Sequence, residues 1–189
     1  MLALALVLAA TGVRAQVPVT EISQFNVERT EEGVLLSASI NVELPPIIDD
    51  ALQKGIPMFF VAEAAIYRER WYWADKQVTG VARHMRLSYQ PLTRRWRLMV
   101  SPTPIGSSGL ALGQNFESHD DALAAVRRVS NWKIAEPTEL EADGRYNVVF
   151  RFRLDVSQLP RPFQIGAVGQ SDWNIAAGRT QRLPAEGVR

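Results

Sequence analysis

The feature that most constrains the fold is the recurrence of an apolar residue at every second position in the stretch YNVVFRFRLDV. Every second position there is apolar: Tyr146, Val148, Phe150, Phe152, Leu154 and Val156. Successive side chains of a β-strand point to opposite faces of a sheet, so this spacing predicts one apolar and one polar face. The same alternation recurs from Val34 to Val42. The chain is therefore expected to fold mainly into antiparallel strands that each bury one face.

Two hairpins and a long strand extend this pattern. Residues 22–44 predict a hairpin that turns at Glu31-Glu32-Gly33, and residues 81–102 predict a second hairpin that turns near Pro91. In the second hairpin Arg83 is the one charged residue on an otherwise apolar face. A last strand is expected around residues 172–176.

The segment IPMFFVAEAAIYRERWYW predicts a single long strand over residues 56–73. Its apolar parity slips after Ile66, because Tyr67, Trp71 and Trp73 lie on the face opposite to Ile66. A β-bulge near Tyr67 would restore one apolar face. The three aromatic residues are therefore expected to turn inward and contribute to the core.

Two short helices complete the prediction. Residues 45–55 combine two prolines suited to a first turn, acidic residues near the N-terminus and Gly55 at the end. Residues 118–133 form the clearer helix, with Ser118 as the N-cap. The predicted apolar stripe of that helix is Ala122, Leu123, Val126 and Val129. Residues 103–118, rich in Gly, Pro and Ser, are expected to form a loop.

The expected fold class is thus α+β and mainly antiparallel β, a sandwich or partly open barrel of about seven or eight strands with two short helices. A chain of 189 residues with 47% hydrophobic and 22% charged residues suits one globular domain. This domain is expected to span residues 16–183, followed by a frayed tail at residues 184–189.

The N-terminus predicts export. Leu2 to Ala10 form an unbroken apolar run that is too short for a membrane-spanning helix, which needs about 20 residues. Val13 and Ala15 fit a cleavage site, so residues 1–15 are expected to be a signal peptide cleaved after Ala15, and the protein to be periplasmic without a stable membrane span. The chain contains no cysteine, which excludes disulfides, thiol catalysis and cysteine zinc sites.

Charge is balanced overall but unevenly distributed. Without residues 1–15 the chain has equal numbers of basic and acidic residues, which favours neither nucleic acid nor a membrane surface as partner. Acidic residues dominate residues 16–63 and basic residues dominate residues 68–97. The two segments face each other or are solvated, or the basic segment meets an anionic ligand or partner. We expect no nucleic-acid partner.

No catalytic or metal-binding constellation is apparent. The chain lacks a GxSxG motif, a phosphate-binding loop and histidines at metal-ligand spacing. His119 is expected in the exposed first turn of a capped helix, and His84 on the solvent face of a strand. The paired carboxylates lie in a turn and at helix starts, where they have structural roles. We therefore expect no enzyme activity, no cofactor and no metal.

The segments ALQKGIP, RERWYWADK and LSYQPLTRRW are distinctive. With QLPRPFQI they resemble the bacterial family of exported proteins catalogued as domain of unknown function 4390, over essentially the whole chain after residue 15. The resemblance implies no established activity, cofactor or catalytic residue. Family genes tend to lie near those of sensor histidine kinases, which implies an envelope protein such as a sensor kinase as partner.

Three functions remain open. The leading hypothesis is a non-catalytic binding or protein-interaction module, an accessory to envelope signalling. Its candidate interaction surface comprises Arg68, Arg70, Trp71, Trp73, Arg95 and Trp96. The alternative is a carrier of a lipid or other apolar ligand in a β-cup, which needs a cavity between the sheet and the helix at residues 118–130. The third is an envelope hydrolase that uses His84 or His119.

Overall fold

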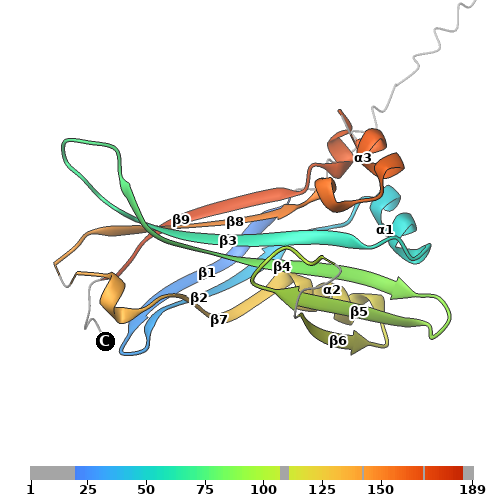
Figure 1. Cartoon of the computed structure of the whole chain (residues 1–189), viewed down its shortest axis with the longest axis horizontal. Coiled ribbons are helices and arrows are strands. Elements are labelled where there is room, and N and C mark those ends of the chain that lie inside the picture. Colours follow the sequence, from blue (N-terminus) through green and yellow to red (C-terminus); the bar gives the residue numbers. More distant parts are fainter. Residues whose placement is uncertain (1–19, 107–110, 142, 168, 185–189) are drawn as a thin grey trace, which may run out of the picture.

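The computed structural model describes residues 20–106, 111–141, 143–167 and 169–184 (Figure 1). The expected signal peptide and most of the expected tail lie outside these residues. The strands are β1 (Glu21–Thr30), β2 (Gly33–Asn41), β3 (Met58–Arg68), β4 (Lys76–Gln90), β5 (Arg95–Ser101), β6 (Leu112–Phe116), β7 (Arg128–Ala135), β8 (Tyr146–Leu154) and β9 (Ala176–Arg182). The helices are α1 (Pro46–Gln53), α2 (His119–Arg127) and α3 (Arg161–Ala167), with short 3-10 turns η1 (Pro137–Glu139), η2 (Val156–Gln158) and η3 (Ser171–Trp173).

These strands form two antiparallel sheets. The larger sheet has the order β6-β5-β4-β3-β8-β9, and the smaller has the order β1-β2-β7. Figure 1 shows the smaller sheet lying along one face of the larger one, with α1 and α3 gathered at one end. The sheets are not closed into a barrel. This confirms the predicted class, a mainly antiparallel β fold with few helices.

The core lies between the two sheets, where the alternating residues converge. The residues Tyr146, Val148, Phe150, Phe152 and Leu154 of β8 are all buried, as their spacing predicts. Phe60 of β3 stacks on Phe152, with ring centroids 5.7 Å apart, and Phe25 of β1 contacts Phe150 from the smaller sheet at 5.8 Å. Full burial of such large rings supplies much of the driving force that holds the sheets together.

The β-bulge is present, but it does not turn the tryptophans inward. Ile66 pairs with Thr79 and Tyr67 pairs with Gln77, so the register shifts at the predicted position. The extra residue is Val78 on β4. Strand β3 therefore keeps its own parity and ends at Arg68. The prediction that Trp71 and Trp73 help build the core is wrong, because both lie in the connection after the strand and are exposed.

The C-terminal half of the predicted helix at residues 118–133 is also wrong. Ser118 caps α2 as expected and accepts a hydrogen bond from the amide of Asp121. The helix ends at Arg127, however, and β7 begins at the next residue. Val129 lies in β7, paired with Ala38 of β2. Pairing with the free edge of β2 outweighs helix continuation in a segment with branched and aromatic residues.

Three smaller elements also differ from the prediction. Strand β6 forms inside the segment expected as a loop, where it pairs with β5. The last strand is β9, which lies later than expected, and its predicted place holds η3. Helix α3 was not predicted. Helix α1 confirms the first predicted helix, with Ile48, Ala51 and Leu52 buried.

Candidate functional site

Three consecutive aromatic residues protrude from the end of the larger sheet. Trp71, Tyr72 and Trp73, here called the aromatic tip, lie between β3 and β4 in a loop that projects beyond the neighbouring strands (Figure 1). Their exposed fractions are 94%, 67% and 73%. Trp71 and Tyr72 contact each other edge to face, with ring centroids 5.0 Å apart. The tip therefore presents three large aromatic rings to the exterior, two of which are in contact.

The base of this loop is held by charged side chains. The Arg68 guanidinium donates two hydrogen bonds to the Glu141 carboxylate, at 2.5 and 2.7 Å. Glu69 accepts hydrogen bonds from Asn147 of β8 and from Arg182 of β9, each at 3.1 Å. These contacts join the loop to the start of β8 and the end of β9. Bidentate arginine–carboxylate pairs fix geometry as well as adding energy.

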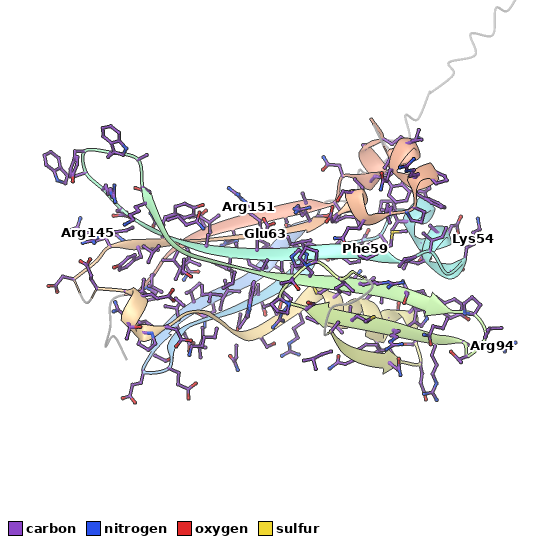
Figure 2. All side chains as sticks on the ribbon, viewed as in Figure 1. Lys54, Phe59, Glu63, Arg94, Arg145 and Arg151 are labelled. Carbon is purple, nitrogen blue, oxygen red and sulfur yellow. The ribbon has the colours of Figure 1, made fainter. Side chains whose placement is uncertain are left out.

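A cleft of about 580 Å³ lies between the loop and the connection that leads into β8. Arg70 and Trp71 line one wall, and Asp143 and Arg145 line the other. Figure 2 shows Arg145 at the end of the molecule that carries the protruding rings. Among the described residues, neither Arg70 nor Arg145 has an ion pair or a side-chain hydrogen bond. Two cations are thus available beside the aromatic tip.

The six residues of the predicted surface do not lie together. Arg68, Arg70, Trp71 and Trp73 are at this end, whereas Arg95 begins β5 after the β4–β5 turn at the other end of β4. Trp96 is only 6% exposed, so it belongs to the core. Its ring packs against Tyr89 and His119, with centroid distances of 4.9 and 4.8 Å. The prediction of one surface that includes Arg95 and Trp96 is therefore wrong.

Several residues of this site were not among the six that the sequence predicted. Tyr72 is part of the exposed aromatic tip, and Glu141 and Arg145 come from a connection far along the chain. A prediction that ended β3 at the charged sequence RER would have left the three aromatic residues in an exposed loop. The contribution of residues 141–145 has no local signal, because it depends on β3 pairing with β8.

The two histidines sit in different settings. His119 Nε2 lies 3.1 Å from Asp49 of α1, and Nδ1 lies 3.3 Å from Asp120. The ring also packs against the Trp96 ring in a tilted arrangement, with an interplanar angle of 57°. His119 therefore joins α1 to α2 and is less exposed than predicted.

His84 lies opposite Ser101 of β5 and has a buried Nδ1 that makes no hydrogen bond within the described residues. Burial lowers the pKa of the His84 imidazole, and Arg153 acts in the same direction, against the nearby Asp155 and Glu63. The Ser101 hydroxyl instead contacts Thr103. Within the part of the chain that the structure describes, no serine–histidine hydrogen bond is formed.

The described residues contain no group of three or more His, Cys, Asp or Glu side chains arranged to hold a metal ion. They also contain no helix with the length and apolar character needed to cross a membrane.

The family model described as "Domain of unknown function (DUF4390)" matches residues 18–183. The chain belongs to this family, as its distinctive segments indicate. No curated protein and no solved structure shows a significant match to the chain. The family assignment carries no activity or ligand with it.

Proposed function

We propose that this protein is an exported, non-catalytic interaction module that holds a partner protein of the cell envelope through its aromatic tip. The observation that carries the proposal is the exposure of Trp71, Tyr72 and Trp73 side by side on one loop, at 94%, 67% and 73%. Soluble proteins rarely leave contiguous large apolar groups in water without a binding role. Tryptophan, tyrosine and arginine are also the residues that dominate protein–protein hot spots.

The geometry of the loop suits a convex contact that enters a pocket on the partner. Aromatic side chains each bury about 150–250 Å² when covered, so three of them supply a large part of a small interface. Arg70 and Arg145 flank the tip and have no ion pair within the described part of the chain, so they can pair with carboxylates at the rim of such a pocket. The base formed by Arg68, Glu69 and Glu141 fixes the loop before binding, which lowers the entropic cost of association.

The proposal is tested by site-specific crosslinking in cells. A photoreactive phenylalanine analogue in place of Tyr72 is expected to give a discrete protein adduct. The same analogue in place of Leu92 is the matched control, because Leu92 is fully exposed in the turn at the opposite end of β4. Equal adducts from both positions would contradict a specific surface. Adducts with lipid alone would indicate a membrane contact and contradict a protein partner.

A pair of double variants then separates binding from folding. Trp71→Ser with Trp73→Ser is expected to abolish the adduct while the melting temperature stays within about 2 °C, since neither side chain is buried. Leu92→Ser with Ile165→Ser removes two other exposed apolar residues and is expected to leave the adduct intact. Loss of the adduct in both double variants would point to a general loss of hydrophobic surface.

Export and partner identity are parts of the same proposal. The envelope location is supported by the apolar N-terminal run, which has the length of a signal-peptide core. Periplasmic fractionation followed by N-terminal sequencing is expected to give a chain that begins at Gln16. A sensor kinase is the partner class that we test first in the crosslinked material. A chain that retains Met1 in the cytoplasm would overturn this part of the proposal.

A further inference from the structure

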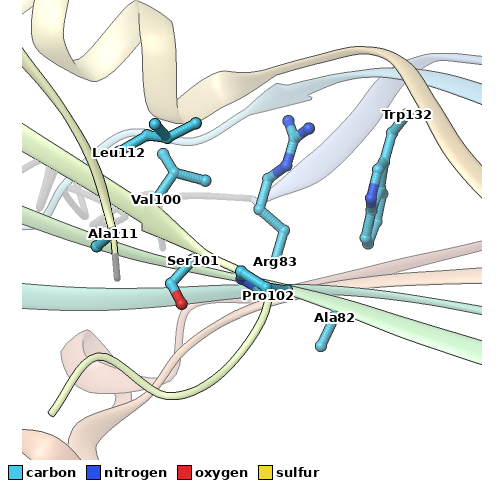
Figure 3. Close-up of a pocket in the computed structure, with 8 residues that line it drawn as sticks. All are labelled: Ala82, Arg83, Val100, Ser101, Pro102, Ala111, Leu112 and Trp132. Atoms are coloured by element: carbon cyan, nitrogen blue, oxygen red, sulfur yellow. The ribbon is translucent and has the colours of Figure 1, made fainter. Parts of the chain in front are cut away.

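A second hollow lies between the sheets, away from the aromatic tip. The larger sheet has six strands and the smaller has three, so the smaller sheet cannot cover the whole inner face. Strand β7 packs against β4, and α2 packs against β5 and β6. Between them remains a pocket of about 470 Å³ (Figure 3). We call it the Arg83 pocket, and its principal lining residues are Arg83, Val100, Pro102, Ala111, Leu112 and Trp132.

Arg83 is a charged residue on the mostly apolar inner face of the larger sheet. It faces inward from β4 at the position paired with Ala62, in a row that includes the apolar Val81 and Met85. Figure 3 shows its side chain rising between Trp132 on one side and Val100 and Leu112 on the other. The guanidinium carbon lies 5.3 Å from the centre of the Trp132 ring. A cation is thus held in an apolar setting by a cation–π contact.

No anion balances this cation within the described residues. Arg83 makes no ion pair and no side-chain hydrogen bond there. Burial lowers the pKa of the Arg83 guanidinium, as expected for a cation that has lost part of its hydration without gaining an opposite charge. Buried charges in proteins are normally paired, so this partly buried guanidinium is a candidate partner for an anion that enters the pocket.

The residues that line the pocket indicate which kind of anion would fit it. Apart from Arg83, the walls are mostly aliphatic or aromatic, and the volume lies in the range of small-molecule sites. A guanidinium recognises carboxylate and phosphate oxygens through parallel hydrogen bonds. We propose that the Arg83 pocket binds a small amphiphile with an apolar chain and a single oxyanion head, which pairs with Arg83 while the chain packs against Val100, Leu112 and Trp132. This inference is independent of the partner proposed for the aromatic tip.

The first test compares probes on the unaltered protein by isothermal titration calorimetry. Decanoate, decyl phosphate and decanol share a chain and differ in the head group, and acetate carries the head without the chain. Decanoate or decyl phosphate is expected to bind at least about tenfold more tightly than decanol, since a charge-assisted hydrogen bond supplies such a factor. The tighter of the two identifies the head. Equal binding of decanol, or no binding of any probe at millimolar concentration, would overturn the proposal.

The second test removes the charge. Arg83→Met keeps much of the length of the side chain and is expected to reduce oxyanion binding to the level of decanol, while decanol binding is unchanged. Arg151→Met is the matched control, since Arg151 is an exposed arginine on β8 of the same sheet, with its side chain on the outer face (Figure 2). Retained oxyanion selectivity in Arg83→Met would contradict the assignment. Should that variant fold poorly, the probe comparison on the unaltered protein still decides the question.

A third measurement examines competing occupants. Sedimentation with and without decanoate is expected to show one unchanged species. A dimer that dissociates as decanoate binds would place a second copy of the chain over the pocket and overturn the proposal for a small amphiphile.

Discussion

The guanidinium of Arg68 and the carboxylate of Glu141 form a two-pronged pair, with N–O distances of 2.5 and 2.7 Å. The pair ties the last residue of β3 to the connection that leads into β8, so it holds the two walls of the cleft below the aromatic tip. Both side chains remain substantially exposed, at 41% and 66%. Its main contribution is therefore to local geometry, since exposed ion pairs add little to global stability.

Glu141→Gln is expected to loosen the tip without unfolding the protein. The free energy of unfolding, measured with urea, should fall by about 0.5 kcal/mol or less. Amide hydrogen exchange in residues 69–75 should become faster, because the loop loses one of its charged attachments. The control is Glu136→Gln, which breaks the Lys133–Glu136 pair at 2.6 Å but makes no contact with the loop. Unchanged exchange in residues 69–75 would show that the pair does not position the tip.

Gly33→Ala is expected to lower the stability of the smaller sheet markedly. Gly33 has a φ of +124° at the start of β2, and a methyl group there would lie 2.1 Å from the carbonyl oxygen of Ala135 on β7. Backbone atoms cannot move aside as a flexible side chain can, so strain and steric conflict add. A loss of about 2 kcal/mol or more is expected in chemical denaturation.

The control for this prediction is Gly106→Ala. No atom of the described residues lies within 4 Å of the added methyl group there, and the backbone φ is not in the left-handed region. Its free energy of unfolding should change by less than about 0.5 kcal/mol. Equal effects of the two substitutions would contradict the steric explanation.

How far the fold follows from the sequence is clearest where β8 and the segment after β3 are compared. In β8 each alternate residue is buried, so periodicity alone identifies strand, face and core. After Ile66 the same reasoning fails, because it assumes that the strand continues beyond Arg68, where β3 ends. The bulge lies at the expected place, but the extra residue belongs to β4, a partner that local periodicity cannot reveal. Trp71 and Trp73 therefore lie on the surface and not in the core, where they were predicted.

The junction between α2 and β7 shows a second limit. Ser118 and the acidic first turn identify the helix start by local chemistry, and the structure confirms them. Its end is decided by the edge of β2, which lies far away in sequence and pairs with residues from Arg128 onward. The candidate site also depends on long-range pairing, since Glu141 and Arg145 are brought to it by the pairing of β3 with β8. Local signals therefore identify the tip as unusual, and long-range pairing decides what surrounds it.

Trp96 and Trp71 should respond in opposite ways to truncation. Trp96→Ala removes a ring that is 6% exposed and packs on Tyr89 and His119, so a loss of about 3–5 kcal/mol is expected. Trp71→Ala removes a ring that is 94% exposed, and its free energy of unfolding should change by less than about 0.5 kcal/mol. Urea denaturation, followed by circular dichroism, measures the free energy of unfolding of both variants. A Trp71→Ala variant that is clearly destabilised would contradict the exposed position of the Trp71 ring.

The pKa of His84 predicts a specific dependence of stability on pH. Burial lowers the pKa of this imidazole in the folded protein, with Arg153 in the same direction, and the carboxylates of Asp155 and Glu63 offset this only in part. In the unfolded chain a histidine has a pKa of about 6.5. As the pH falls below that value, the unfolded state takes up a proton that the folded state does not yet bind. Unfolding is therefore favoured, and stability contributed by the neutral His84 is lost between about pH 7 and pH 5.

His84→Gln isolates this effect, because glutamine is polar but does not titrate. The decrease in unfolding free energy between pH 7 and pH 5 should be smaller in the variant than in the unaltered protein. Asp155 does not interfere in this window. Burial alone would raise the pKa of its carboxyl, but hydrogen bonds from Ser157 and Gln158, together with Arg153, lower it overall. Its contribution is therefore lost only in more acidic solution, as the pH falls through the lowered pKa. Identical pH profiles for the variant and the unaltered protein would contradict a neutral, partly desolvated His84.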